Sequence, residues 1–199
     1  MSDAETIQKE INRLGGIQPL EGKYYPLNEA EIAEVEQEVR NDFPKEYSLL
    51  LNRYGSFLFA NSVAFVPIKS APEYSHEERL GIPNGSVFSG SEVSVVYGKR
   101  HNNQKFELLQ NLRVFRDRMP EGFLPFADDG LGNQLCLGLN TEHVPKVYWW
   151  DHELEWDAED YEAETGTPMP VEAKYQNVYL VANSLTEFFE RLTISFLAI

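Results

Sequence analysis

The chain lacks the features that would place it outside the cell or in a membrane. Its 199 residues contain a single cysteine, Cys136, which excludes an internal disulfide and favours a reducing compartment. No apolar run is long enough to span a bilayer, and the first residues lack the basic and apolar regions of a signal peptide. We therefore expect a cytoplasmic protein with no membrane partner.

Basic residues are also few. The chain has 17 lysines and arginines against 32 aspartates and glutamates, which gives a formal net charge of −15. Direct binding to nucleic acid draws on cationic contacts to phosphate, so this charge argues against nucleic acid and against an anionic membrane surface. A basic protein partner fits the charge, and solubility alone is the alternative explanation.

Motifs of catalysis and cofactor binding are missing as well. The sequence has no Gly-x-Ser-x-Gly elbow for a nucleophilic serine and no Walker-type glycine loop for a nucleotide. Cys136 lies between Leu135 and Leu137 on an expected strand, where a cysteine behaves as a small apolar residue. We predict that the chain is not an enzyme and uses no cofactor.

Metal ligation is not indicated either. Asp151, His152 and Glu153 are consecutive, and on a strand the histidine would point away from the two carboxylates. The turn at residues 128–130 lacks the further oxygen ligands of a calcium loop. We predict no metal site.

The composition is that of a folded protein. Hydrophobic residues make up 42% of the chain and aromatic residues 13%, enough for the core of one domain spanning residues 1–199. Capping residues and apolar spacing predict several helices, and the clearest runs from Pro44 to Gly55 with apolar residues at i, i+3, i+4 and i+7. The predicted helices cover residues 3–14, 28–43, 44–54, 103–119 and 184–196.

Strands are predicted between these helices. Residues 57–68 are expected to form a strand pair that turns in its middle, and residues 92–97 a further strand. Leucines alternate along residues 135–139, and residues 147–150 are β-branched or aromatic throughout, as expected near the middle of a sheet. With residues 178–181 as a last short strand or extended segment, the order of elements predicts an α+β fold with a mainly antiparallel sheet.

Several short motifs follow one another along the chain. A helix containing a proline and aromatic residues ends at Tyr54-Gly55, and the segments Leu-Pro-Phe-Ala-Asp, Gly-Asn and Val-Tyr-Trp-Trp-Asp-His-Glu follow it. In this order and spacing the chain resembles the SUKH superfamily, which includes bacterial immunity proteins against secreted toxins and fungal regulators of cell-wall synthesis. The resemblance covers roughly residues 28–194, leaves residues 1–27 as an N-terminal helix and connector, and implies a sheet of about six strands flanked by helices. The matching residues are Phe43, Pro44, Tyr47, Tyr54, Gly55, residues 124–128, Gly132, Asn133 and residues 147–153.

One segment is far more acidic than the rest. Between Asp151 and Glu164, eight carboxylates occupy 14 consecutive positions without a lysine or arginine, and Trp156 and Tyr161 are interleaved with them. A solvated acidic loop is one explanation. A contact surface is the other, in which the aromatic residues anchor a partner and the carboxylates attract a cationic one. The predicted partner-binding residues are Asp128, Asp129, Asp151, Glu153, Glu155, Trp156, Asp157, Glu159, Asp160 and Tyr161.

A basic stretch has the opposite sign. Residues 99–118 hold six lysines and arginines against two acids, a local charge of +4. This stretch forms either the solvent face of the predicted helix or an internal partner of the acidic segment. We favour the solvent face, because exposed ion pairs contribute little stability.

The resemblance predicts an immunity protein, which binds and neutralises a cognate toxin domain without chemistry of its own. An acidic surface is complementary to the cationic groove of a nuclease, so a basic toxin, with nucleases as the leading class, is the expected partner. The rival prediction is a regulatory scaffold that binds endogenous proteins. A small-molecule-binding or enzymatic variant is the third alternative, because residues 69–91 are rich in Pro, Gly and Ser and form an excursion that could shape a pocket.

Overall fold

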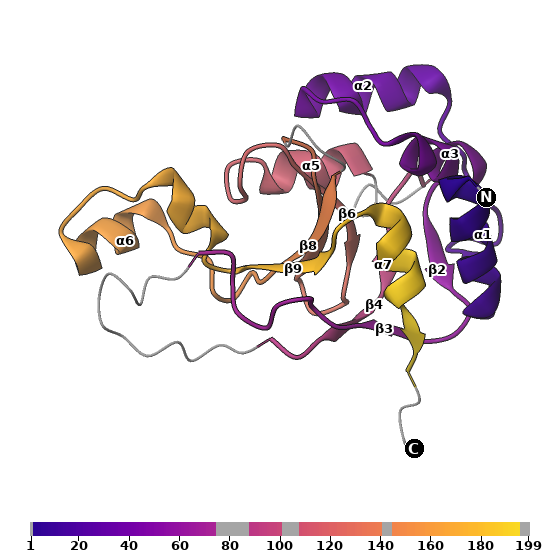
Figure 1. Cartoon of the computed structure of the whole chain (residues 1–199). Coiled ribbons are helices and arrows are strands. Elements are labelled where there is room, and N and C mark those ends of the chain that lie inside the picture. The colour runs from indigo at the N-terminus through magenta and orange to yellow at the C-terminus, as the bar shows by residue number, and fades with distance from the viewer. Residues whose placement is uncertain (1, 75–87, 101–107, 141–144, 196–199) are drawn as a thin grey trace.

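Two antiparallel sheets form the centre of the molecule (Figure 1). The structure is a computed structural model, and it describes residues 2–74, 88–100, 108–140 and 145–195. The larger sheet has seven strands in the order β1-β2-β5-β6-β7-β8-β9, one more than predicted, and every neighbouring pair is antiparallel. Its strands are β1 Ile17–Pro19, β2 Phe57–Phe59, β5 Val95–Val96, β6 Phe123–Asp128, β7 Gln134–Gly138, β8 Lys146–Trp150 and β9 Val178–Ala182.

The smaller sheet corrects two strand predictions. Residues 57–68 do turn in their middle, but the strands on either side of the turn enter different sheets and do not pair with each other. Residues 92–97 likewise break at Ser94, whose backbone N–H donates to the Asp128 carbonyl of the larger sheet at 2.8 Å. The strands of the smaller sheet, in the order β10-β3-β4, are β10 Thr193–Ile194, β3 Val63–Phe65 and β4 Ser91–Val93.

The helices begin at the capping residues that the sequence indicates. Asn28 accepts from the Glu31 backbone N–H at 3.0 Å, and the Glu31 carboxylate accepts from the Asn28 N–H in return. Pro44 precedes the next helix, and Gly55 ends it with a positive φ of 66°. These are α2 Glu29–Val39 and α3 Lys45–Tyr54, and the other helices of the body are α1 Asp3–Arg13, α5 Leu108–Phe115 and α7 Leu185–Arg191.

Three helices are shorter than predicted. The first, α2, ends at Val39 instead of Phe43, because Arg40 adopts a left-handed conformation with a φ of 60°. The described part of the 103–119 helix, α5, ends at Phe115, and a turn follows in which Met119 N–H donates to the Phe115 carbonyl at 3.1 Å. The last helix, α7, ends at Arg191 because Leu192 is extended and leads into β10. Residues 101–107 and 196–199 lie outside the described residues.

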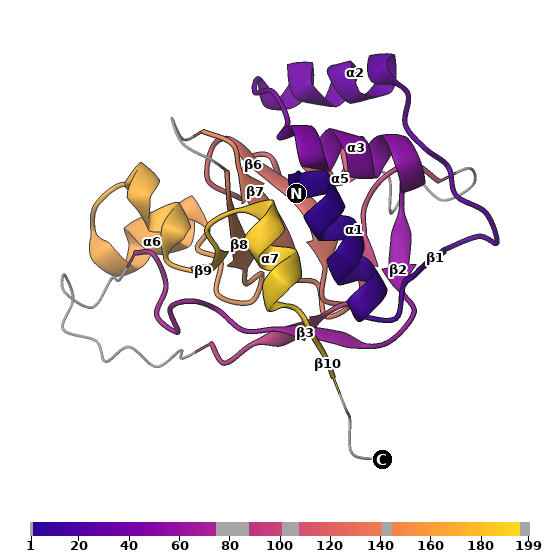
Figure 2. The ribbon, with the colours of Figure 1, turned by 45° about the vertical axis from the view of Figure 1, so that its right-hand side comes forward.

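Both faces of the larger sheet are buried at strands β6 to β9. Helices α1, α3 and α7 lie side by side over one face (Figure 2), and Trp149 belongs to the core between them and the sheet. Trp150 points to the opposite face, where it packs in a second apolar cluster with Met119 and Cys136. This double coverage explains the continuous apolar run of β8. Trp149 and Trp150 are both buried, which confirms the prediction that this run lies near the middle of a sheet. No helix among the described residues has the length and apolar character needed to cross a membrane.

The acidic segment leaves the sheet as an arm. We call residues 151–177, between β8 and β9, the acidic arm. It contains α6 Ala158–Thr165 and a short 3-10 helix, η2 Val171–Tyr175. In Figure 1 α6 projects at the left of the molecule, far from α1, α2 and α3.

Candidate functional site

The turn between β6 and β7 is organised by a buried carboxylate. Asp129 is 8% exposed, and its Oδ2 accepts from Asn133 Nδ2 at 2.8 Å and from Trp149 Nε1 and Ser91 Oγ at 3.2 Å each. Its Oδ1 accepts from the Leu131 backbone N–H at 3.0 Å. Four donors from three separate segments therefore converge on one side chain, which holds the turn on the sheet.

Asp128 is buried in the same turn. Its carboxylate accepts from the Tyr97 hydroxyl at 2.9 Å and from the Gly130 backbone N–H at 3.1 Å. Burial, and then the neighbouring Asp128, raise the pKa of Tyr97 far above its usual value. The carboxylates of Asp128 and Asp129 are thus occupied by hydrogen bonds within the protein. Both residues were among the predicted partner-binding residues, and the partner surface proposed below omits them.

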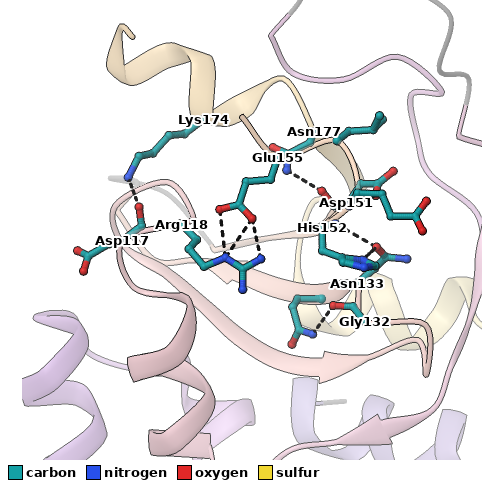
Figure 3. Close-up of polar contacts among 12 residues, drawn as sticks. Asp117, Arg118, Gly132, Asn133, Asp151, His152, Glu155, Lys174 and Asn177 are labelled. Atoms are coloured by element: carbon teal, nitrogen blue, oxygen red, sulfur yellow. Dashed lines mark hydrogen bonds and ion pairs between the residues drawn. The ribbon is translucent and has the colours of Figure 1, made fainter. Parts of the chain in front are cut away.

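The turn packs directly against the start of the acidic arm (Figure 3). Asn133 Oδ1 lies 3.1 Å from the backbone nitrogen of His152 and 2.8 Å from its Nδ1. Gly132 has a φ of 106°, and a Cβ there would lie 3.0 Å from Cε1 of the His152 ring. Only glycine suits both the backbone and the space at this position.

The two ends of the arm are joined to each other. Asp151 N–H donates to the Asn177 carbonyl at 2.9 Å, and Asn177 Nδ2 donates to the Asp151 carbonyl at 2.7 Å (Figure 3). The Asp151 carboxylate accepts from the Glu153 backbone N–H at 2.9 Å. Partial burial is the main cause that raises the pKa of the Asp151 carboxyl. Asp151 is therefore part of the arm's base.

Glu155 is bound to the body of the protein. Both of its carboxylate oxygens accept from Nε of Arg118, at 3.1 and 3.0 Å, and one also accepts from Nη2 at 2.6 Å (Figure 3). The same guanidinium lies over the rings of Phe115 and Trp150, 5.1 and 5.2 Å from their centroids. The sequence gives no local signal for this contact, because 37 positions separate its two residues.

The second half of the acidic run forms a helix, α6, which the sequence did not predict, and the acids of this helix are exposed to solvent. Asp157 caps α6 by accepting from the Glu159 backbone N–H at 2.8 Å, and Glu159 and Asp160 occupy the first turn, where carboxylates are favourable. Tyr161 is the one buried residue of α6 and packs edge-on against Trp156, with ring centroids 5.8 Å apart. With a single buried position, α6 has no apolar periodicity from which the sequence could predict it.

The rest of the acidic run, between Asp151 and Glu164, presents an acidic surface. Six carboxylates of this run are exposed, and none of them forms an ion pair with another described residue. Leu154 beside them is 41% exposed, and Leu131 at the tip of the adjacent turn is 74% exposed. Sequence reasoning missed Leu131, whose only signal is its place between two turn glycines. The exposed acids are Glu153, Asp157, Glu159, Asp160, Glu162 and Glu164.

The basic stretch is paired within the protein. Four of its described side chains stay at the surface as predicted, whereas that of Arg100 is only 13% exposed. Each described lysine and arginine of the stretch forms an ion pair, which the sequence interpretation did not favour. Among the described residues of the stretch, only Arg118 pairs with the acidic arm, while Arg113 and Arg116 pair with Glu38 of α2. The remaining pairs are Lys99 with Glu31 and Arg100 with Glu21, and Lys105 lies outside the described residues.

A hollow beside the acidic arm offers no selective chemistry. A cavity of about 310 Å³ lies between the end of α2, the turn after α5 and Lys174 of the arm. Its mouth carries three cations and three carboxylates, which favours neither charge of ligand. In the excursion at 69–91, residues 75–87 lie outside the described residues, and within the described residues no three metal-binding side chains converge.

Two comparisons relate the chain to known proteins. The model of the SMI1 / KNR4 family (SUKH-1) matches residues 26–191. The chain is also similar to the SPbeta prophage-derived uncharacterized protein YokK of Bacillus subtilis (strain 168), with 22% identity over 177 residues. That match covers 84% of this chain and 76% of YokK.

Proposed function

We propose, from the finding that this chain belongs to the SMI1 / KNR4 family (SUKH-1), that it is an immunity protein that neutralises a cognate toxin domain by binding it through the acidic arm. Family membership by itself assigns an immunity or regulator-like domain. The toxin, its basic character and the surface that meets it are the parts we propose. In this proposal the protein acts in the cytoplasm and without catalysis.

The observation that carries the proposal is the set of exposed, unpaired carboxylates on α6. Several other acids are neutralised by ion pairs, Glu31 and Glu38 in the body of the protein and Glu155 at the stem of the arm. Glu159, Asp160, Glu162 and Glu164 have no such partner among the described residues, so their field extends into solvent. Projection of α6 from the sheet leaves this field open to a large partner (Figure 1).

A field of this sign favours a cationic partner. Complementary charge raises association rates, up to about 10⁸–10⁹ M⁻¹s⁻¹ at low salt, and loses its effect as ions screen it over about 8 Å at physiological strength. A nuclease toxin has a cationic substrate groove and would be attracted in this way. The partly buried Trp156 and the exposed Leu154 supply apolar contact within the acidic surface.

The first experiment tests neutralisation itself. A toxin domain encoded beside the gene for this chain is expressed in a bacterial host with and without the chain, and survival is measured. Rescue supports an immunity protein. Failure of the chain to bind or neutralise this domain, with binding to an endogenous protein instead, would favour the regulatory scaffold.

The second experiment tests the arm as the interface. Replacing the four α6 carboxylates by their amides changes the net charge from −15 to −11 and keeps side-chain shape. We expect about tenfold slower association with the toxin at low salt and a weaker dependence of that rate on salt. The variant is Glu159→Gln, Asp160→Asn, Glu162→Gln and Glu164→Gln.

A control variant removes the same charge elsewhere. It carries four amide substitutions at exposed acids of α2, the residues after it and α7, remote from α6. Stopped-flow rates for the control should stay within about twofold of wild type, and equal slowing in both variants would argue against the arm as the interface. The control is Glu29→Gln, Glu34→Gln, Asp42→Asn and Glu190→Gln.

A further inference from the structure

We infer that Arg118 is the positioning residue of the acidic arm: it holds α6 in the orientation in which its carboxylates meet the partner. This inference rests on the proposed function. Arg118 lies in the turn after α5, outside the arm and outside the exposed acidic surface. It therefore acts on binding through Glu155, with which it pairs.

The turn that carries Arg118 holds both stems of the arm. Arg118 binds Glu155 on the stem that leads from β8 to α6. The preceding residue, Asp117, accepts through its carbonyl from Nζ of Lys174 at 2.7 Å, on the stem that returns to β9 (Figure 3). Two adjacent residues of one turn, Asp117 and Arg118, thus bind both stems of the arm.

The contact of Arg118 is built for orientation. Three N–H···O distances of 2.6 to 3.1 Å join its guanidinium to one carboxylate, a planar arrangement that a lysine cannot reproduce. The rings of Phe115 and Trp150 limit where the guanidinium can lie. Trp150 is fully buried in the sheet. The contact of Arg118 with its ring therefore fixes the arm relative to the rigid sheet.

The arm depends on such ties because it has little core of its own. Of its eight α6 residues only Tyr161 is buried. A helix of this length is marginal in water without tertiary contacts. Freeing the stem at Glu155 would let α6 reorient and fray, and a partner would then have to order it again on binding.

A role of Arg118 through its charge and a role through positioning the arm predict opposite changes in toxin affinity when Arg118 is replaced, so one substitution distinguishes the two roles. Replacing it by glutamine makes the net charge −16, so long-range attraction of a cationic toxin would slightly increase. Loss of positioning instead lowers affinity. Arg116→Gln is the matched control, because Arg116 lies two residues earlier, is similarly exposed and pairs with Glu38 of α2 instead of the arm.

Hydrogen–deuterium exchange of the free, full-length protein tests the tie without any partner. Arg118→Gln should speed exchange of the α6 amides, such as Tyr161 N–H bonded to Asp157, about tenfold, with α1 and α3 unchanged. Arg118→Lys should give an intermediate rate, and Arg116→Gln the wild-type rate. Unchanged α6 exchange in Arg118→Gln, or equal acceleration in Arg116→Gln, would overturn the inference.

Stopped-flow binding to the toxin domain that the chain neutralises gives the second measurement. Arg118→Gln should weaken the complex about tenfold, mainly through faster dissociation, whereas Arg116→Gln should not. A loosened arm with unchanged binding would overturn the positioning role while leaving the proposed function standing. Unchanged rates in the neutralised α6 variant would instead overturn the proposed function.

Discussion

At the scale of single residues, the aspartates and glutamates of this chain have different structural roles, which the sequence alone does not distinguish. Asp129 is buried among four donors, Glu155 is bound by an arginine, Asp157 caps a helix, and Glu162 is exposed. Each environment follows from which donors the fold brings near. Substitutions at these acids should therefore have separable effects on stability and on binding.

Asp129→Asn should destabilise the protein by about 2–4 kcal/mol. The amide keeps the shape of the side chain but places an NH₂ where one carboxylate oxygen was. In either orientation of the amide a buried donor, the N–H of Leu131 or that of Trp149, therefore loses its acceptor. Urea denaturation measures the change. Asp160→Asn, the same chemical change on the exposed face of α6, should stay within about 0.5 kcal/mol. Similar losses in the two variants would contradict the structural role assigned to Asp129.

At the scale of elements, α2 and α6 are both capped at the N-terminus but are integrated to different degrees. Asn28 caps α2, which buries Ile32 and Val35. Asp157 caps α6, which buries only Tyr161. A cap contributes about 1 kcal/mol to its helix, but that energy enters the global stability only if the helix unfolds together with the domain.

Asp157→Ala should therefore act locally and Asn28→Ala globally. We expect α6 amides to exchange about fivefold faster in Asp157→Ala, with the urea midpoint unchanged, whereas Asn28→Ala lowers the free energy of unfolding by about 1 kcal/mol. Hydrogen exchange and urea titration of both variants provide the measurements. A lowered urea midpoint in Asp157→Ala would show that α6 unfolds with the core.

At the scale of the whole molecule, both apolar clusters share the larger sheet. Trp149 and Trp150 are neighbours on β8, yet one lies in the main core and the other in the cluster with Cys136. If either cluster unfolded, one apolar face of the strands that both clusters share would be exposed to water. We therefore predict that the chain unfolds as one domain.

Cys136 provides the measurement for this prediction. It is fully buried, and burial raises the pKa of its thiol well above the ordinary value, so a thiol reagent should reach it only on unfolding. In urea, Cys136 labelling and tryptophan fluorescence should report one coincident transition. Labelling at a lower urea concentration than the fluorescence change would reveal two separate cores and contradict a single domain.

Much of the fold was predictable because its signals are short in range. The cap of Asn28 with Glu31, and the interval from Pro44 to Gly55, involve residues within about three turns of helix. The alternation of residues 135–139 and the apolar run at 147–150 likewise predicted β7 and β8. Local hydrogen bonds and side-chain periodicity encode such elements directly.

The sequence by itself determined where α2, α3 and α7 begin, the α+β class, the net charge and the place of the acidic run. Only the tertiary structure decided which acids are exposed. Asp129 is buried because donors from Ser91 and Trp149 meet it, and Glu155 is occupied because Arg118 lies beside it, 37 positions away. The division of residues 57–65 between two sheets was decided in the same way. Burial and pairing depend on residues that only the folded chain brings together, so no local pattern could reveal them.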